Sequence, residues 1–334
     1  MLKLYFKGSN RFLRRDFKRL YSSSTAWNVL FFGSDQFSLY SLKLLCSYYQ
    51  ELQLINKLDV VTKITKQAND VQKFATNQNL TLYNWPDVPI ERKYDVGVVV
   101  SFGYLIPQCI IEQFPYGILN VHGSLLPKWR GAAPIIYSLA KGDRETGVTV
   151  MRIKPNKFDT GDILLQESHP VGKDTMMPEL HKSLGELGAQ ALVKTLKDLP
   201  NYIQFSKPQS NDHATYAPKV LPDFAVIKWD SMNSQQVYNL YRALYGFLLP
   251  TTEWHKVQVK LSGIKVNDEV GDIEDQKPGC VSYSKMTKRL NVICADKTII
   301  SVDSVSVLGK KVMSAADFHN GFLSKVPVNL RYFV

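Results

Sequence analysis

The run Asn28-Val-Leu-Phe-Phe-Gly33 decides the fold class of the first part of the chain. It is a short apolar segment that ends in glycine, and a helix-compatible stretch follows it from residue 37 to residue 49. A buried parallel strand that leads into a helix across a tight turn has this pattern. The run therefore predicts the opening of a β-α-β unit.

Further strand candidates follow, with room for helices between them. The clearest is Tyr94-Asp-Val-Gly-Val-Val-Val100, a β-branched run of the kind that is buried on both faces. The others are residues 58–64, 80–83, 118–122 and 146–152. This alternation predicts an α/β fold with a doubly wound, mostly parallel sheet, which binds its ligands at the carboxyl ends of the strands.

The character of the sequence changes after Leu199. Residues 200–222 are rich in proline and polar residues, which predicts a linker between two domains, and residues 230–246 have the apolar spacing of a helix. Short alternating segments separated by turn residues then predict a small β-barrel. These segments are residues 257–261, 279–283, 290–295 and 298–307.

The excess of positive charge is concentrated at the N-terminus. The chain of 334 residues has 41 Lys and Arg against 30 Asp and Glu, and residues 1–27 contribute +6 of the net charge of +11. This segment is rich in arginine and serine and poor in acids, which predicts a mitochondrial transit peptide and a location in the mitochondrial matrix. The alternative is a flexible basic arm that binds nucleic acid.

The composition excludes several classes of protein. With 45% apolar and 21% charged residues, the chain has the make-up of an ordinary globular protein. Its longest apolar run, residues 96–106, is too short to cross a bilayer, so we expect no membrane span. The cysteines and histidines lack the spacing of a disulfide framework or a metal site, so we expect no metal. The absence of G-x-G-x-x-G disfavours a nicotinamide-dependent oxidoreductase.

Candidate catalytic residues are concentrated in residues 120–134. Asn120 and His122 are two positions apart at the end of a predicted strand, so their side chains point to the same face. An amide there can donate to a developing oxyanion while an imidazole exchanges protons near neutral pH. The structural alternative is that Asn120 caps a turn and His122 is a satisfied core residue. The glycines and prolines that follow the strand favour the functional interpretation.

The segment Phe158-Asp-Thr-Gly-Asp162 is a second polar cluster. It follows the predicted strand at residues 146–152, and we expect its loop at the same edge of the sheet as His122. A carboxylate beside an imidazole fixes the orientation of the ring and favours its charged form. Asp-Thr-Gly is also a common turn, in which the aspartates cap local backbone groups. With no nucleophilic serine or cysteine assigned, these residues suggest direct group transfer.

The combined motifs resemble those of the methionyl-tRNA formyltransferase family, from about residue 28 to residue 325. Asn-x-His and the later Asp are shared with folate-dependent formyltransferases in general, whereas the longer combination is specific to the tRNA enzymes. The motifs are Asn120-Val-His-Gly-Ser-Leu-Leu-Pro127, Trp129-Arg-Gly-Ala-Ala-Pro-Ile135, Asp159-Thr-Gly-Asp162 and, in the C-terminal part, Thr215-Tyr-Ala-Pro-Lys219 and Ile227-Lys-Trp-Asp230.

The resemblance implies a reaction and its site residues. The formyl group of 10-formyltetrahydrofolate would pass to the amino group of methionine on initiator tRNA, for initiation of mitochondrial translation. Asn120 and protonated His122 would stabilise the tetrahedral oxyanion, and Asp159 would hold His122 or a water that relays the proton. The resemblance places part of the folate site at Ser124, Leu125, Leu126 and Pro127.

The resemblance also implies a domain organisation and a monomeric enzyme. Residues 28–207 would form the catalytic domain, residues 208–222 the linker, and residues 223–334 an OB-like β-barrel that binds tRNA. The basic insertion that enters the tRNA acceptor stem in the family is reduced here to residues 63–66. Candidate phosphate contacts are Lys128, Arg130, Lys310 and Lys311, for each of which a solvated surface charge is the alternative.

Two other functions share most of these features. The first is another enzyme dependent on 10-formyltetrahydrofolate, which acts on a purine intermediate or a sugar nucleotide and needs no barrel. The second is a non-enzymatic RNA-binding protein on the same fold, against which the intact Asn, His and Asp set argues.

Overall fold

The computed structural model describes residues 26–88, 93–267 and 277–334. Internal contacts divide the chain into two units. Of the described residues, the first unit contains those up to residue 122 together with 148–167 and 185–211, and the second contains those in 123–147, 168–184 and 212–334. The predicted transit peptide lies outside the described residues, except for its last two positions, and Trp27 already belongs to the first strand.

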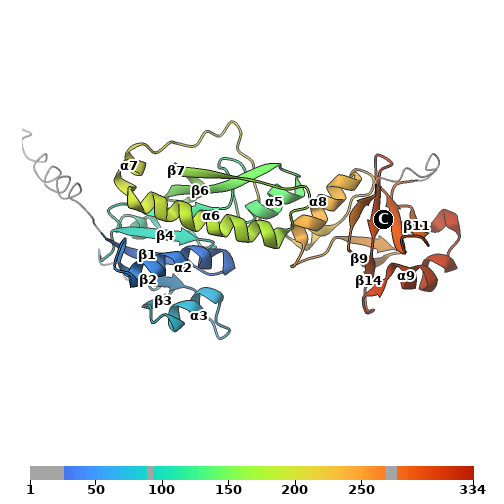
Figure 1. Cartoon of the computed structure of the whole chain (residues 1–334), viewed down its shortest axis with the longest axis horizontal. Coiled ribbons are helices and arrows are strands. Elements are labelled where there is room, and N and C mark those ends of the chain that lie inside the picture. The colour runs from blue at the N-terminus through green and yellow to red at the C-terminus, as the bar shows by residue number, and fades with distance from the viewer. Residues whose placement is uncertain (1–25, 89–92, 268–276) are drawn as a thin grey trace, which may run out of the picture. The chain divides into compact units, whose positions relative to one another are not determined.

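The main sheet has seven strands within the described residues, in the order β3-β2-β1-β4-β5-β6-β7 (Figure 1). Pairing is parallel from β3 to β5, and β6 runs antiparallel to β5. This order confirms the predicted doubly wound, mostly parallel sheet. The strands are β1 (Trp27–Gly33), β2 (Ile55–Thr62), β3 (Leu82–Asn84), β4 (Val96–Val100), β5 (Ile118–His122), β6 (Glu145–Lys154) and β7 (Lys157–Pro170).

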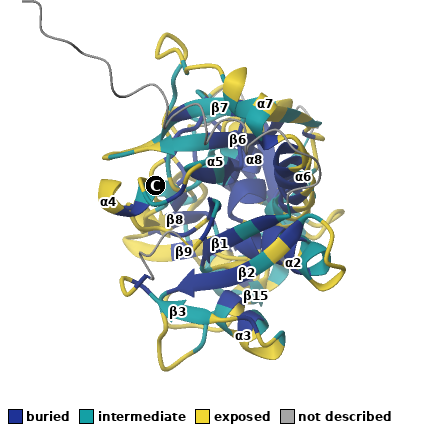
Figure 2. Ribbon diagram, turned by 90° about the vertical axis from the view of Figure 1, so that its left-hand side faces the viewer, coloured by how far each residue is buried: buried dark blue, intermediate teal, exposed yellow. Residues whose placement is uncertain are grey.

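Both faces of the central strands are buried, as a doubly wound sheet requires (Figure 2). On one face, Leu30 and Phe32 of β1 belong to an apolar cluster that includes Trp85. On the other face, helix α6 packs so closely that a Cβ added at Gly188 would lie 2.7 Å from the side chain of Val121 in β5. The helices between and after these strands are α2 (Gln36–Gln50), α3 (Asp70–Asn77), α4 (Gln108–Ile111), α6 (Met177–Lys197) and α7 (Leu199–Gln204).

Several helices begin at side chains that cap their first turn. Asp35 before α2, Asn69 before α3 and Asn233 before α8 (Ser234–Leu244) each accept a hydrogen bond from the backbone N–H three residues later. These N–H groups have no partner within their own helix, so a capping side chain stabilises the start of the helix by about 1 kcal/mol. The sequence therefore defines where these helices start.

The C-terminal part contains two four-stranded antiparallel sheets among the residues that the structure describes, in the orders β10-β13-β12-β11 and β15-β14-β9-β8. Their apolar residues and those of α8 share one buried cluster, which includes Trp229, Trp254 and Phe318. The elements of the second unit are α5 (Pro134–Ala140), α8 (Ser234–Leu244), α9 (Ala315–Gly321), β8 (Thr251–Trp254), β9 (Val257–Ser262), β10 (Lys265–Asn267), β11 (Val281–Ser284), β12 (Arg289–Ile293), β13 (Ile299–Val302), β14 (Ser304–Val307), β15 (Met313–Ser314) and the short 3-10 helices Pro222–Ala225, Leu323–Lys325 and Val328–Leu330.

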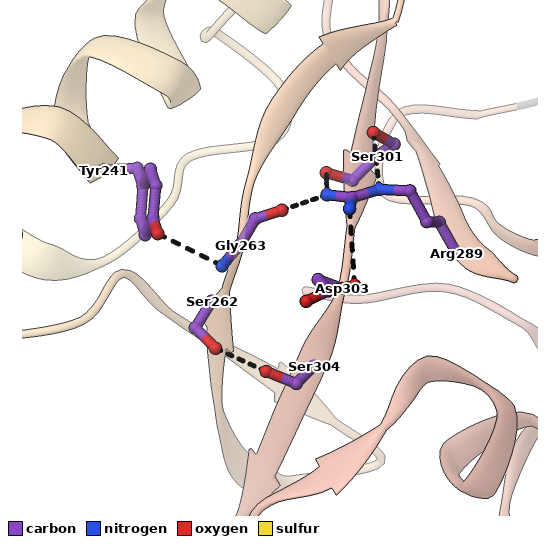
Figure 3. Close-up of polar contacts among 7 residues, drawn as sticks. All are labelled: Tyr241, Ser262, Gly263, Arg289, Ser301, Asp303 and Ser304. Atoms are coloured by element: carbon purple, nitrogen blue, oxygen red, sulfur yellow. Dashed lines mark hydrogen bonds and ion pairs between the residues drawn. The ribbon is translucent and has the colours of Figure 1, made fainter. Parts of the chain in front are cut away.

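The chain passes twice from one small sheet to the other, and polar contacts join the two crossings (Figure 3). β9 leads through Gly263 into β10, and β13 leads through Asp303 into β14. Gly263 has a φ of +63°, which glycine adopts without a steric penalty. Arg289 of β12 donates hydrogen bonds to the Gly263 carbonyl, to Ser301 and to Asp303. Consecutive strands that pass from one sheet to the other in this way are typical of small barrels and agree with the predicted OB-like domain.

The structure differs from the sequence prediction at three places. Residues 298–307, predicted as one segment, form two strands, because the chain changes sheets at Asp303. The predicted linker begins with helix α7, since Pro200 occupies the first turn, where proline is tolerated. Residues 157–170 form β7, for which no strand was predicted, because an edge strand that is partly exposed lacks a continuous apolar run. No helix in the described part of the chain has the length and apolar character that a membrane span requires.

Candidate active site

Asn120 and His122 project from β5 onto one face of the main sheet. Alternation along β5 places them on the side of Ile118, which belongs to the apolar cluster around Phe32, and opposite Val121, which faces α6. His122 is the last residue of β5 and is buried, at 6% exposure. The carboxyl ends of parallel strands are where open α/β sheets bind ligands. The predicted position of this pair is therefore the one observed.

Asp159 reaches this place by a route that differs from the expected one. β6 runs antiparallel to β5, so its last residues lie beyond Leu119 at the start of β5 and not beside His122. The chain turns at Pro155 and Asn156 and continues as β7, where Asp159 has a left-handed backbone with a φ of +53°. The prediction of a loop at the carboxyl edge was therefore wrong, and the edge strand β7 positions the carboxylate instead.

The structure brings the three predicted side chains together around one carboxylate oxygen. Asn120 donates from Nδ2 to Oδ1 of Asp159 at 3.3 Å, and Nδ1 of His122 lies 3.5 Å from the same oxygen. Both distances are longer than the roughly 2.7–3.2 Å of an ordinary N–H···O hydrogen bond. The side chains of His122 and Asp159 are 6% and 10% exposed, so the pair is largely shielded from water. Shielding strengthens the interaction between an imidazolium and a carboxylate.

Two further polar contacts surround this cluster, and neither was predicted from the sequence. Thr149 is the cross-strand partner of His122, and the hydroxyl of Thr149 accepts a hydrogen bond from the amide of Gln166 at 3.0 Å. The amide nitrogen of Gln209 donates to the backbone carbonyls of Asp159 and Gly161 at 3.1 and 2.8 Å. Gln209 lies in the stretch predicted as a linker, and no motif or spacing connects it to residues 50 positions earlier.

This arrangement is suited to chemistry at a carbonyl group. A carboxamide can donate to an oxygen that gains negative charge, and an imidazole can take up or release a proton. A carboxylate within reach of both fixes their orientation and stabilises the charged imidazole. Asn120, His122 and Asp159 therefore fit the transfer of an acyl group between two nucleophiles. Within the ranges that the structure describes, no group of three His, Cys, Asp or Glu side chains is arranged to hold a metal ion.

The predicted folate segment lies in the second unit and is held in a turn. Ser124 donates from its hydroxyl to the Lys128 carbonyl at 2.6 Å, and the peptide bond between Leu126 and Pro127 is cis. Ser124 and Leu126 are buried, whereas Leu125 and Pro127 are half-buried. The Ser124 hydroxyl therefore helps to define the shape of this loop.

The predicted tRNA contacts differ in how available their charges are. Lys128 forms an ion pair with Asp143 at 2.8 Å, and the same carboxylate accepts from the indole of Trp129 at 2.7 Å. Arg130 is only 4% exposed, so its guanidinium is poorly placed to meet a phosphate on the surface. Lys310 and Lys311 are both exposed and follow β14 in the second unit. Exposure favours these two lysines as phosphate contacts.

Two family models together match most of the chain. The model described as formyl transferase matches residues 29–196, and the model described as formyl transferase, C-terminal domain, matches residues 219–323. Asn120, His122 and Asp159 lie within the first match. The two lysines at positions 310 and 311 lie within the second.

Solved structures to which the chain is similar include formyltransferases and HypX. HypX from Aquifex aeolicus, crystallised with tetrahydrofolic acid, has a TM-score of 0.60 and 17% identity over 90% of this chain and 48% of its own. WlaRD, described as a sugar 3N-formyl transferase, has a TM-score of 0.62 and 18% identity over 86% of this chain and 100% of its own. At these identities the likeness concerns the fold.

Relatives with higher sequence identity define the family. The mitochondrial methionyl-tRNA formyltransferases of Homo sapiens and Bos taurus are 42% and 41% identical over 309 residues, which are 89% of this chain and 78% of each relative. The methionyl-tRNA formyltransferase of Ehrlichia canis is 32% identical over 88% of this chain and 97% of its own length. From the matched models, the coverage of these relatives and the clustered Asn, His and Asp side chains, the chain belongs to the methionyl-tRNA formyltransferase family.

Proposed function

We propose that this protein transfers the formyl group of 10-formyltetrahydrofolate to the amino group of methionine on initiator tRNA, for the initiation of mitochondrial translation. Two kinds of observation support this proposal. Its mitochondrial relatives are methionyl-tRNA formyltransferases at up to 42% identity. Asp159 Oδ1 lies within 3.5 Å of both Asn120 Nδ2 and His122 Nδ1, and this geometry is the observation on which the proposal chiefly rests.

The three side chains have distinct roles in this proposal. Asn120 donates a hydrogen bond to the formyl oxygen as that oxygen gains negative charge, and protonated His122 adds positive charge beside it. A C–N bond forms to the methionine nitrogen, the C–N bond to the donor breaks, and the proton lost by the amine returns to the departing nitrogen. Asp159 orients His122 and assists this proton transfer. The folate supplies only the activated formyl group.

The remaining binding residues follow the same proposal. Ser124, Leu125, Leu126 and Pro127 would line part of the folate site, in the loop that the Ser124 hydroxyl helps to shape. Lys310 and Lys311 would contact tRNA phosphates, with Lys128 and Arg130 as weaker candidates because one is paired and the other buried.

We extend the proposal to the organisation of the protein in the cell. The N-terminal basic segment acts as a transit peptide, which ends before Trp27 because that residue begins β1. The enzyme works as a monomer in the mitochondrial matrix. Residues 28–207 form the catalytic domain, residues 208–222 the linker and residues 223–334 the tRNA-binding domain. The acid-poor, arginine-rich composition of the first segment and the positions of the two family matches support this division.

The test is a transfer assay with purified protein, 10-formyltetrahydrofolate and charged mitochondrial initiator tRNA. We expect N-formylmethionine from the wild type and a loss of about 100-fold or more in kcat for His122→Ala, with tRNA affinity unchanged. His213→Ala is the matched control, because His213 is exposed and lies outside the cluster.

Two results would contradict the proposal. A fully active His122→Ala variant would show that the reaction does not need the imidazole. Formylation of an amino sugar nucleotide or a purine intermediate in place of methionyl-tRNA would assign the protein to another class of formyltransferase.

A further inference from the structure

The backbone at Asp159 needs contacts that hold it in place. Its φ of +53° lies in the left-handed region, which has a steric cost for a residue with a Cβ, although aspartate adopts it more readily than most. Contacts from neighbouring groups offset this cost. Without such contacts the backbone at Asp159 would relax toward ordinary strand geometry. The carboxylate would then turn away from Asn120 and His122.

The side chain of Gln209 makes contacts of this kind. Its Nε2 donates to the carbonyl oxygen of Asp159 at 3.1 Å and to that of Gly161 at 2.8 Å. One amide nitrogen with two hydrogens thus joins the carbonyls on either side of Thr160. We propose that Gln209 is a positioning residue for formyl transfer, which holds the backbone of Asp159 so that its carboxylate meets Asn120 and His122. This inference rests on the function proposed above.

A second set of contacts links Gln209 to the strands beside the cluster. Its Nε2 also lies 3.7 Å from the sulfur of Met151, and Met151 is the cross-strand partner of Asn120. Gly161 in turn packs so closely on β6 that an added Cβ would collide with the backbone at Arg152. Gln209 therefore connects the strand of the carboxylate to the part of β6 that pairs with the strand of the carboxamide.

The chemistry of this contact requires a glutamine. Two carbonyl acceptors need two donor hydrogens, which the carboxamide supplies from one nitrogen. Methionine has a similar length and no donor, and ionised glutamate has the same shape but only acceptors, which would face two carbonyl oxygens. Gln209→Met and Gln209→Glu therefore remove the hydrogen bonds with little change in volume.

A double-mutant cycle with Asp159 tests the proposal. We expect Gln209→Met and Gln209→Glu to lower kcat for formyl transfer about 10- to 100-fold, with KM for both substrates changed less than about twofold, because misplacing a reacting group acts on the transfer step. In the Asp159→Asn background, Gln209→Met should cause less than about a threefold further loss, since both changes remove the same oriented carboxylate. Gln113→Met is the control, because it also removes a hydrogen bond from a side-chain amide to a backbone carbonyl. Gln113 donates to the carbonyl of Cys109 at 3.2 Å.

Three results would overturn the proposal. The first is a kcat for Gln209→Met within twofold of that for Gln113→Met. The second is an equal loss of kcat in the Asp159→Asn background. The third is unfolding of both Gln209 variants, judged by circular dichroism. The last two results would assign Gln209 a general structural role.

Hydrogen exchange separates this inference from the proposed function. Backbone amides of residues 157–163 should exchange faster in Gln209→Met than in Gln113→Met, without any substrate present. Equal exchange would overturn the anchoring role even if the wild type formylates methionyl-tRNA. A wild type that transfers no formyl group to methionyl-tRNA would contradict the proposed function, whereas the exchange result would still decide whether Gln209 anchors Asp159.

Discussion

Gly161→Ala is the substitution for which the structure gives the clearest quantitative expectation. A Cβ built at Gly161 overlaps the carbonyl oxygen of Arg152, and it lies 2.8 Å from the carbonyl carbon of that residue and 3.2 Å from Cα of Ile153. Ordinary contacts begin at 3.4 Å, and all three neighbours are backbone atoms, so β6 and β7 must move apart by more than the 0.6 Å that the carbonyl carbon alone requires. A forced shift of packed backbone costs about 1–3 kcal/mol in the free energy of unfolding.

The same shift acts on the active site, because Asp159 is two residues away and the Gly161 carbonyl accepts from Gln209. A displacement approaching 1 Å at a reacting group lowers the rate by up to about 100-fold. We therefore expect kcat to fall by about 10- to 100-fold in the formyl transfer assay, while urea denaturation shows the loss of stability. Gly321→Ala is the control, since a Cβ there meets no atom within 4 Å. A Gly161→Ala variant as active and as stable as Gly321→Ala would refute the reasoning.

Four further predictions concern the rest of the fold. Burial raises the pKa of the Cys294 thiol from 9.0 to about 12. Between about pH 9 and 12 the unfolded state therefore loses this proton while the folded state keeps it, so the free energy of unfolding falls as the pH rises. In urea denaturation, Cys294→Ala should reduce this pH dependence. In the native protein, iodoacetamide should modify the exposed Cys109 and spare Cys294, as mass spectrometry of the peptides will show. Arg242→Met should lower the free energy of unfolding by about 2–4 kcal/mol, because the buried guanidinium donates to two backbone carbonyls in the segment before α6, and equal stability would refute this role. Trp129→Phe should lower the free energy of unfolding by about 1 kcal/mol, because it removes the hydrogen bond from the indole to Asp143. An unchanged midpoint of urea denaturation would contradict this prediction.

The fold of the first unit was predictable because its signals are local. A buried parallel strand needs a continuous apolar run, and residues 28–33 and 94–100 provide such runs. The helices that follow begin at capping residues such as Asp35, which act on the backbone within three positions. Edge strand β7 was missed because partial exposure leaves no continuous apolar pattern to find.

The candidate site was only partly predictable. Asn120 and His122 share a face because they are two positions apart on a strand, and this relation is visible in the sequence alone. The sequence also indicated the polar cluster of residues 158–162, and the family resemblance singled out Asp159 within it, but the predicted route of the carboxylate through a loop at the carboxyl edge was wrong. The observed route depends on the antiparallel pairing of β6 with β5, which no pattern in residues 145–154 specifies.

The sequence by itself therefore determined which residues form strands, where helices begin and which side chains share a face, since each of these depends on neighbours within a few positions. Only the tertiary structure decided the contacts across long separations. Gln209 meets the backbone of Asp159 because β7 and the segment after α7 lie side by side, and the burial of Arg130 depends on what packs around it. Such contacts follow from how the chain folds back on itself, and a single sequence contains no periodic signal for them.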